Sequence, residues 1–338
     1  MDLFFTPAEE AFRTELRAWL RENLPSDGDS SRELPTLAEE VTVLRAWQRR
    51  LHDGGWVGIH WPREYGGHGA SVVEHYIFQE EIAAARAPEI INRIGVNLVG
   101  PTLIAHGTEE QRRRFLPPIL PAEELWCQLF SEPGAGSDLT ALRTRAERRG
   151  DGWVVTGQKV WTSYAQFARW GILLARTDPD APKAKGISYL ICDMHAPGVT
   201  VRPLRQMTGS EEFNEVFLDE VFVPRAQLVG AEHAGWAIAN TTLAHERGTS
   251  PLARREPLGP ESSFIKLFWS EMSQRMHDTL MDLLGPAGLC WQPGPQAIAG
   301  GRLTRSYLYY RAASLFAGTS EIQRNILAER VLGLPRVR

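Results

Sequence analysis

The stretch 127–163 holds the residues of this chain best suited to bind a flat, polar ligand. Its Glu-Pro-Gly-Ala-Gly-Ser-Asp turn at 132–138 lets the backbone approach a ligand closely, and nearby hydroxyl and N–H groups can receive polar atoms. The hydroxyls of Thr162 and Ser163 follow the indole of Trp161, which offers an apolar wall with a polar edge. The stretch predicts a strand-and-loop platform for a flat heterocycle with an anionic tail. An ordinary hairpin pair with turn glycines is the alternative that the local pattern leaves open.

Other kinds of catalytic or binding site find little support in the sequence. The nine histidines show no HxxxH or HExxH spacing, so we expect no metal site. No GxSxG elbow is present for a serine nucleophile. Three cysteines, far apart and without CxxC spacing, are typical of inert thiols in a reducing cytoplasm. The run Gly134-Ala135-Gly136 lacks the third glycine of a dinucleotide fingerprint.

The composition is that of an ordinary globular protein long enough for two or three packed units. The 338 residues are 43% hydrophobic and 23% charged. A net charge of −4 gives no reason to expect nucleic acid or an anionic membrane surface as a partner. The first residues lack the pattern of a signal peptide, and no apolar run approaches the ~20 residues of a membrane span. We therefore expect a cytoplasmic protein that does not bind membranes.

The elements that must position the platform follow from caps and periodicity. Capping boxes at Thr6 and Thr36 predict two helices, and helical patterns continue at 72–87 and 109–115. Short β-branched and aromatic runs separated by turns then fill the region from Leu125 to about Ala231, and the pattern is helical again from Gly235.

This order predicts an α+β multidomain fold of three parts. They are an N-terminal helical domain at 1–124, a middle antiparallel β-barrel or sandwich at 125–231, and a C-terminal helical bundle at 232–338.

Two long motifs carry a family resemblance. The stretch 127–163 resembles the middle-domain signature of the acyl-CoA dehydrogenase family, flavoenzymes that desaturate acyl-CoA thioesters between the α and β carbons. The run 315–325, LFAGTSEIQRN, resembles a second signature of that family and follows in the family's order. The resemblance implies a helical domain, a β-domain and a four-helix bundle that packs a tetramer.

The resemblance also implies FAD as cofactor and assigns residues to it. The implied flavin contacts are Phe130, Ser131, Trp161, Thr162, Ser163, Leu284, Gly285, Thr319 and Glu321. The implied substrate contacts are Ser137, Leu243 and Arg247. An acyl-CoA is the expected substrate, and an electron-transferring flavoprotein is the expected electron acceptor.

The catalytic base departs from the best-known family pattern. Many members carry glutamate where this chain has Ala317, whose backbone N–H still matches the donor to the thioester carbonyl. A branch that includes actinobacterial enzymes for sterol side chains, which form heterotetramers, places its glutamate on the helix that here contains Glu246. We therefore expect Glu246 as the base and a branched or steroid acyl group. A solvated helical charge pair of Glu246 and Arg247 is the alternative.

The C-terminal bundle is shorter than the family pattern. Relative to the family pattern, we expect roughly fifty residues, about two helices at 1.5 Å per residue, to be absent near 252–258. A natural deletion, an engineered one or residues left out of the numbering would look the same, and we favour an omitted or disordered segment over a working remnant.

Two other functions stay open. The chain could be a non-catalytic subunit of a heterotetrameric dehydrogenase, or a flavin oxidase or monooxygenase on the same fold.

Overall fold

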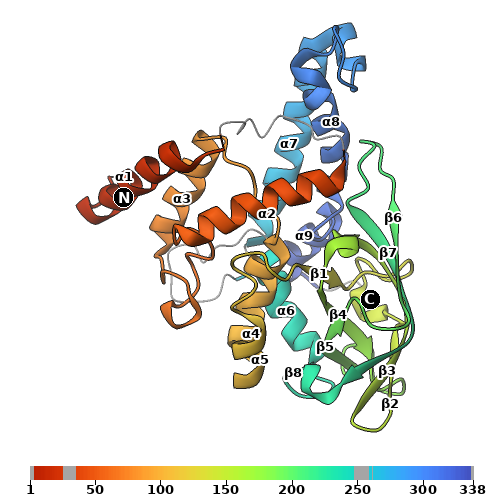
Figure 1. Ribbon diagram of the computed structural model, residues 1–338. Helices are drawn as coiled ribbons and strands as arrows, with labels where there is room; N and C mark the ends of the chain where they lie inside the picture. The colour runs from red at the N-terminus through yellow and green to blue at the C-terminus, as the bar shows by residue number, and fades with distance from the viewer. Residues whose placement is uncertain (1–3, 26–35, 247–258, 261, 336–338) are drawn as a thin grey trace. The chain divides into compact units, whose positions relative to one another are not determined.

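The computed structural model describes residues 4–25, 36–246, 259–260 and 262–335. They divide into two compact units (Figure 1). The first holds the N-terminal helices, the β-domain and the helix up to His245, and the second holds 205–211 and the C-terminal helices. The helix–strand–helix order predicted from the sequence is confirmed.

Capping residues start the N-terminal helices where the sequence predicted. Helices α1 (Pro7–Asn23) and α2 (Leu37–Asp53) begin after Thr6 and Thr36, whose side chains accept the N–H groups of Glu9 and Glu39. Three more helices follow: α3 (Val72–Ala84), α4 (Gly100–His106) and α5 (Glu109–Phe115). Leucine and tryptophan side chains of these helices are buried in one core with the first strand of the β-domain.

A mixed sheet forms the β-domain. Its strands are β1 (Trp126–Leu129), β2 (Arg145–Arg148), β3 (Gly152–Ser163), β4 (Trp170–Arg176), β5 (Ile187–Asp193), β6 (Val199–Leu204), β7 (Phe213–Pro224) and β8 (Leu228–Val229). They are ordered β6-β7-β3-β2-β4-β5-β8, with β1 pairing β4 in parallel. A short pairing of β2 with β4 is also parallel, and the remaining pairings are antiparallel. The predicted β-domain is therefore confirmed, with two parallel pairings to β4 added.

The runs 153–156 and 159–163, which the sequence pattern separates, belong to one strand, β3. Long pairing with β7 carries the strand through Gly157, and the register shifts on either side of it. A Cβ on Gly157 would lie 2.4 Å from Thr144 Oγ1, so the close approach of Thr144 requires glycine here. Long-range pairing therefore overrides the local break that glycine indicates.

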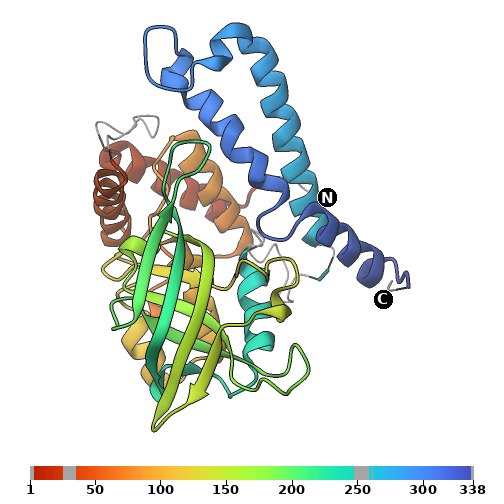
Figure 2. The same cartoon turned by 90° about the vertical axis from the view of Figure 1, so that its right-hand side faces the viewer.

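Helices resume with α6 (Gly235–Glu246), which closes the first unit. The second unit contains the long helix α7 (Ser262–Leu284), with α8 (Arg302–Tyr310) and α9 (Ser320–Ile326) packed on it. Figure 2 shows α8 running back alongside α7. The predicted shortening near 252–258 lies outside the described residues. Among the described helices, none is both long enough and apolar enough to cross a membrane.

Candidate active site

Two segments of the β-domain that contain predicted flavin contacts lie side by side. Phe130 and Ser131 follow β1, and Trp161 and Ser163 stand at the end of β3. The backbone N–H of Val160 donates to the carbonyl oxygen of Ser131 at 2.9 Å, which joins the segments directly. We call residues 130–131 and 161–163 together the flavin shelf.

The flavin shelf contains one exposed ring and one buried hydroxyl that has no partner among the described residues. Trp161 has φ 61° and its side chain is 61% exposed, with its ring edge-on to Phe213 at 6.4 Å. Thr162 is fully buried, and its Oγ1 has no hydrogen-bond partner among the described residues. An exposed indole beside an orphaned hydroxyl fits a planar ligand with a polar edge.

Phe130 contributes to the flavin shelf differently from what the resemblance implies. Its side chain is 3% exposed and packs edge-on against Tyr189, with ring centroids 5.9 Å apart. Only its backbone can therefore face a ligand. Ser131 and Ser163 are half-buried, so their hydroxyls are partly accessible, and Ser137 is exposed in the turn that follows.

A buried ion pair lies next to the flavin shelf, and sequence reasoning missed it. Lys159 is fully buried, and its Nζ donates to Glu132 Oε1 at 2.8 Å, to the Leu174 carbonyl at 2.8 Å and to the Phe130 carbonyl at 3.1 Å. Burial lowers the pKa of Lys159 to about 8, while the neighbouring carboxylate of Glu132 acts in the opposite direction. The one available signal in the sequence was a lysine within a strand-like run.

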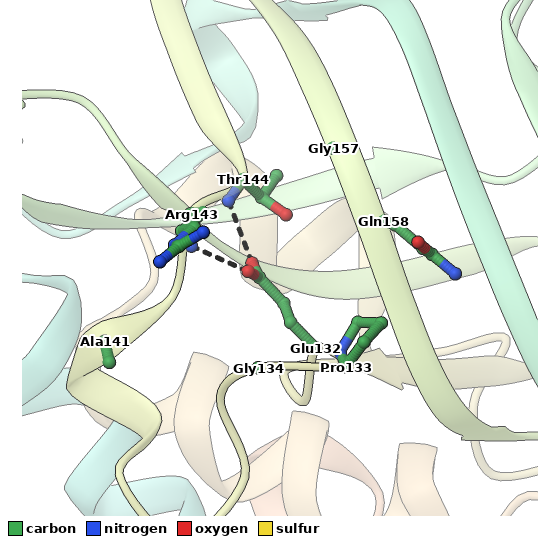
Figure 3. A pocket seen from close by; sticks show the side chains of 8 residues that line it. All are labelled: Glu132, Pro133, Gly134, Ala141, Arg143, Thr144, Gly157 and Gln158. Carbon is green, nitrogen blue, oxygen red and sulfur yellow. Dashed lines mark hydrogen bonds between the residues drawn. The ribbon is translucent and has the colours of Figure 1, made fainter.

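Glu132 is satisfied by backbone donors as well as by Lys159. Its carboxylate accepts the N–H of Arg143 at 2.6 Å and the N–H of Thr144 at 2.9 Å (Figure 3). Burial by itself would raise the pKa of Glu132, but Lys159 and these donors outweigh it and hold the pKa below its usual value. The carboxylate is therefore a fixed negative charge.

A cavity of about 330 Å³ opens beside this carboxylate. Glu132, Pro133, Gly134, Ala141, Arg143, Thr144, Gly157 and Gln158 line it (Figure 3). Among the described residues, no group of three or more histidine, cysteine, aspartate or glutamate side chains is arranged to hold a metal ion.

Helix α6, which carries the predicted base, is anchored by buried hydroxyls. Thr242 is fully buried, and its Oγ1 lies 2.9 Å from Thr102 Oγ1 and 3.1 Å from Tyr189 Oη. Leu243, the predicted substrate contact, is half-buried against the same core. Glu246 is the last residue of α6, one helical turn after Thr242, but its side chain and Arg247 lie outside the described residues.

The second unit holds the loop that contains Ala317. Ala317 and Gly318 have φ 54° and 88°, and the buried Gln323 donates its Nε2 to both carbonyls at 3.0 and 3.3 Å. Thr319 caps α9 by accepting the N–H of Ile322 at 3.2 Å. A backbone N–H bond and the Thr319 hydroxyl lower the pKa of the exposed Glu321. We call 317–323 the C-terminal loop.

The structure does not bring all predicted flavin contacts together. The C-terminal loop lies near the first half of α7, where Trp269 and Phe316 have ring centroids 6.2 Å apart. Leu284 and Gly285 stand at the far end of α7, about 22 Å along the helix axis from Trp269. Figure 2 shows α9 near one end of α7 and the segment after Gly285 at the other. Within one chain these two groups of contacts are therefore separate.

Comparisons with known proteins identify the family. The chain matches family models for the acyl-CoA dehydrogenase N-terminal domain at 6–123, the middle domain at 127–221 and the C-terminal domain at 249–332. Acyl-CoA dehydrogenase IpdE1 of Mycobacterium tuberculosis is 40% identical over 385 aligned residues, covering 97% of this chain and 98% of that protein.

Two solved structures agree with this result. The Tcur3481-Tcur3483 steroid ACAD is 30% identical with a TM-score of 0.86, and the match covers 100% of both chains. The ChsE4-ChsE5 complex from Mycobacterium tuberculosis is 31% identical with a TM-score of 0.84, again covering 100% of both chains. With all three family domains in order and relatives matched along nearly their whole length, this chain belongs to the acyl-CoA dehydrogenase family and is an oxidoreductase of that class.

Proposed function

We propose that this dehydrogenase uses FAD to desaturate an acyl-CoA thioester that carries a bulky, steroid-type acyl group. The observation that carries the proposal is the flavin shelf, where the exposed indole of Trp161 stands beside the unpartnered hydroxyl of Thr162. The chemistry that FAD supplies when bound is acceptance of a hydride, which no side chain can perform. The protein's own residues must bind and orient the cofactor and the substrate, and must remove the α-proton of the substrate.

Two parts of the chain would hold the cofactor. Ser131, Trp161, Thr162 and Ser163 would face the ring, with the backbone of Phe130 beside them. Thr319 and Glu321 of the C-terminal loop would contact the part of FAD away from the flavin ring. These assignments rest on motif positions and on the donors described above.

Leu284 and Gly285 support an oligomer. Because they stand about 22 Å along α7 from the region of the C-terminal loop, they would contact the cofactor of another subunit. One solved relative is the ChsE4-ChsE5 complex, which consists of two named components. We therefore propose a homo- or heterotetramer in which flavin contacts come from more than one chain.

Glu246 would remove the α-proton, and the backbone N–H of Ala317 would stabilise the charge that develops on the thioester oxygen. Helix α6 suits this role because Thr242, one turn before Glu246, is fixed to Thr102 and Tyr189. Arg247, Leu243 and Ser137 would bind the substrate. Alanine at 317 leaves room beside the reacting carbons, and the steroid ACAD relative supports a bulky acyl group.

An anaerobic titration tests the proposal. Purified protein is mixed with a steroid side-chain CoA thioester while the visible flavin absorbance is followed. We expect bleaching with the steroid thioester and much weaker bleaching with a straight-chain thioester of equal carbon count. Purified protein that remains colourless after incubation with FAD contradicts the flavin assignment. Bleaching only by the straight-chain thioester contradicts the substrate assignment. Re-oxidation by added electron-transferring flavoprotein tests the proposed acceptor.

A non-catalytic subunit is the second candidate, and one observation favours it. Helix α7 exposes Phe264, Phe268 and Met276 to 60%, 51% and 62%, which leaves an apolar face in need of cover. The IpdE1 alignment is longer than this 338-residue chain, consistent with residues that the relative has and this chain lacks. Flavin uptake only on mixing with a second, related chain would favour this candidate.

A further inference from the structure

We propose that the buried ion pair of Lys159 and Glu132 is a positioning device that sets the two segments of the flavin shelf against each other. The inference rests on the FAD binding proposed above. Neither residue belongs to the flavin shelf, yet each adjoins one of its segments. Glu132 follows Ser131 directly, and Lys159 comes two residues before Trp161.

Lys159 fixes the first segment from the inside of the domain. Its Nζ donates to the Phe130 carbonyl at 3.1 Å and to Glu132 Oε1 at 2.8 Å, so one ammonium group holds the backbone before Ser131 and the side chain after it. Its third acceptor, the Leu174 carbonyl, belongs to β4. Three acceptors use the full donor capacity of the group and leave it one orientation.

The same lysine also fixes the second segment. Lys159 pairs with Val216 of β7 and is the last paired residue of β3 before a register shift. The register then shifts, Trp161 adopts its left-handed conformation, and Thr162 resumes pairing opposite Asn214. Asn214 Nδ2 donates to the Thr162 carbonyl at 3.0 Å. The turn that exposes the indole is thus held by Lys159 on one side and by Asn214 on the other.

Stability alone is a weak reason for such a pair. Desolvation of two buried charges offsets much of their attraction, and well-packed apolar residues of similar size often stabilise a core equally well. Lys159 makes directed hydrogen bonds to two carbonyls and a carboxylate, and an apolar pair would make none. Those bonds determine where Ser131 and Trp161 stand.

The chain contains a matched control. Lys183 and Asp138 form an ion pair of the same 2.8 Å length, and Asp138 belongs to the turn that begins at Glu132. Their side chains are 70% and 56% exposed, against 0% and 7% for Lys159 and Glu132. A change of Lys183 therefore removes an ion pair near the same turn without removing a buried one.

The experiment compares full-length wild type with three variants: Lys159→Met, the double variant Glu132→Gln/Lys159→Met, and Lys183→Met. Each is stripped of flavin, checked for its fold by far-UV circular dichroism and titrated with FAD. The reduction potential of the bound flavin is then measured. In the double variant no lone charge is buried, so we expect it to fold and to lose less stability than Lys159→Met. The loss that remains comes from the Phe130 and Leu174 carbonyls, which no longer accept from Lys159. We still expect the double variant's Kd for FAD to rise about tenfold or more and its flavin potential to shift, because the shelf is misplaced.

Lys183→Met should match wild type in both measurements. A folded double variant with wild-type FAD affinity and flavin potential overturns the inference, because the pair would then serve stability alone. A double variant that does not fold overturns it as well, since the pair would be a folding determinant. Wild-type protein that binds no FAD is a separate result, which removes the proposed cofactor itself.

Discussion

The two predicted parts of the flavin site are built on different principles. In the β-domain, the flavin shelf is set by a buried ion pair of Lys159 and Glu132. In the second unit, the C-terminal loop is held by a neutral side chain, with Gln323 donating to the carbonyls of Ala317 and Gly318. Charged donors make stronger and more directional hydrogen bonds than neutral ones.

This difference indicates a division of roles. The flavin shelf must keep the cofactor ring in one place, so a rigid anchor suits it. In the proposed mechanism the C-terminal loop presents the Ala317 backbone to a substrate that enters and leaves. A neutral anchor suits that role because it costs less to adjust. The comparison predicts that changes to the first anchor alter flavin binding, whereas changes to the second alter turnover with flavin retained.

The largest expected effect lies at Glu246, the last residue of α6. Glu246→Gln should lower kcat about a thousandfold, because the α-proton loses its acceptor. Flavin content should remain that of wild type, and Glu246→Asp, which keeps a carboxylate, should retain more activity. Steady-state kinetics with an artificial electron acceptor measure the loss. Turnover that persists in Glu246→Gln would falsify the assignment of the base.

The second-largest expected effect is a difference in stability between two variants, one that removes a buried ion pair and one that removes an exposed ion pair. Lys159→Met leaves Glu132 charged and buried without its main partner, so we expect the free energy of unfolding to fall by about 3–5 kcal/mol. Lys183→Met removes an exposed pair and should cost less than about 1 kcal/mol. Denaturant melts of both variants give the two values. Equal losses would show that burial does not distinguish the pairs.

The sequence predicted elements better than it predicted this anchor. Thr6 and Thr36 mark helix starts because a cap is a local interaction within four residues. Lys159 and Glu132 are 27 residues apart, and a lysine is usually at the surface, so only the tertiary structure reveals that both are buried.

The candidate site shows the same limit. Motif positions put Leu284 and Gly285 in one set with Thr319 and Glu321, but the length of α7 separates the two groups in space. The closeness of the two shelf segments could be predicted because they belong to one motif, whereas their contact with a flavin stays a prediction. The side chain of Glu246 lies outside the described residues, so its role stays a prediction.

The third effect tests the neutral anchor. Gln323→Leu removes both hydrogen bonds to the C-terminal loop and should lower the free energy of unfolding by about 1–3 kcal/mol. We expect kcat to fall severalfold, because the Ala317 N–H is no longer held in place, while FAD stays bound. Flavin content and kcat are measured on the same sample. Loss of flavin in this variant would contradict the division of roles between the two anchors.

The smallest expected effect is a pH dependence of stability that His60 causes in the unit that contains the β-domain. Burial, with the nearby His75 and His245, lowers the pKa of His60 from 6.5 to about 3. The folded protein keeps His60 neutral while the unfolded chain takes up a proton, so this contribution to stability is complete above pH 6.5 and is lost between pH 6.5 and about 3. Between pH 7.5 and 5.5 the expected loss is about 1 kcal/mol. Denaturant melts at the two pH values should show it in wild type and a flatter dependence in His60→Gln. An unchanged pH dependence in that variant would assign the acid sensitivity to other groups.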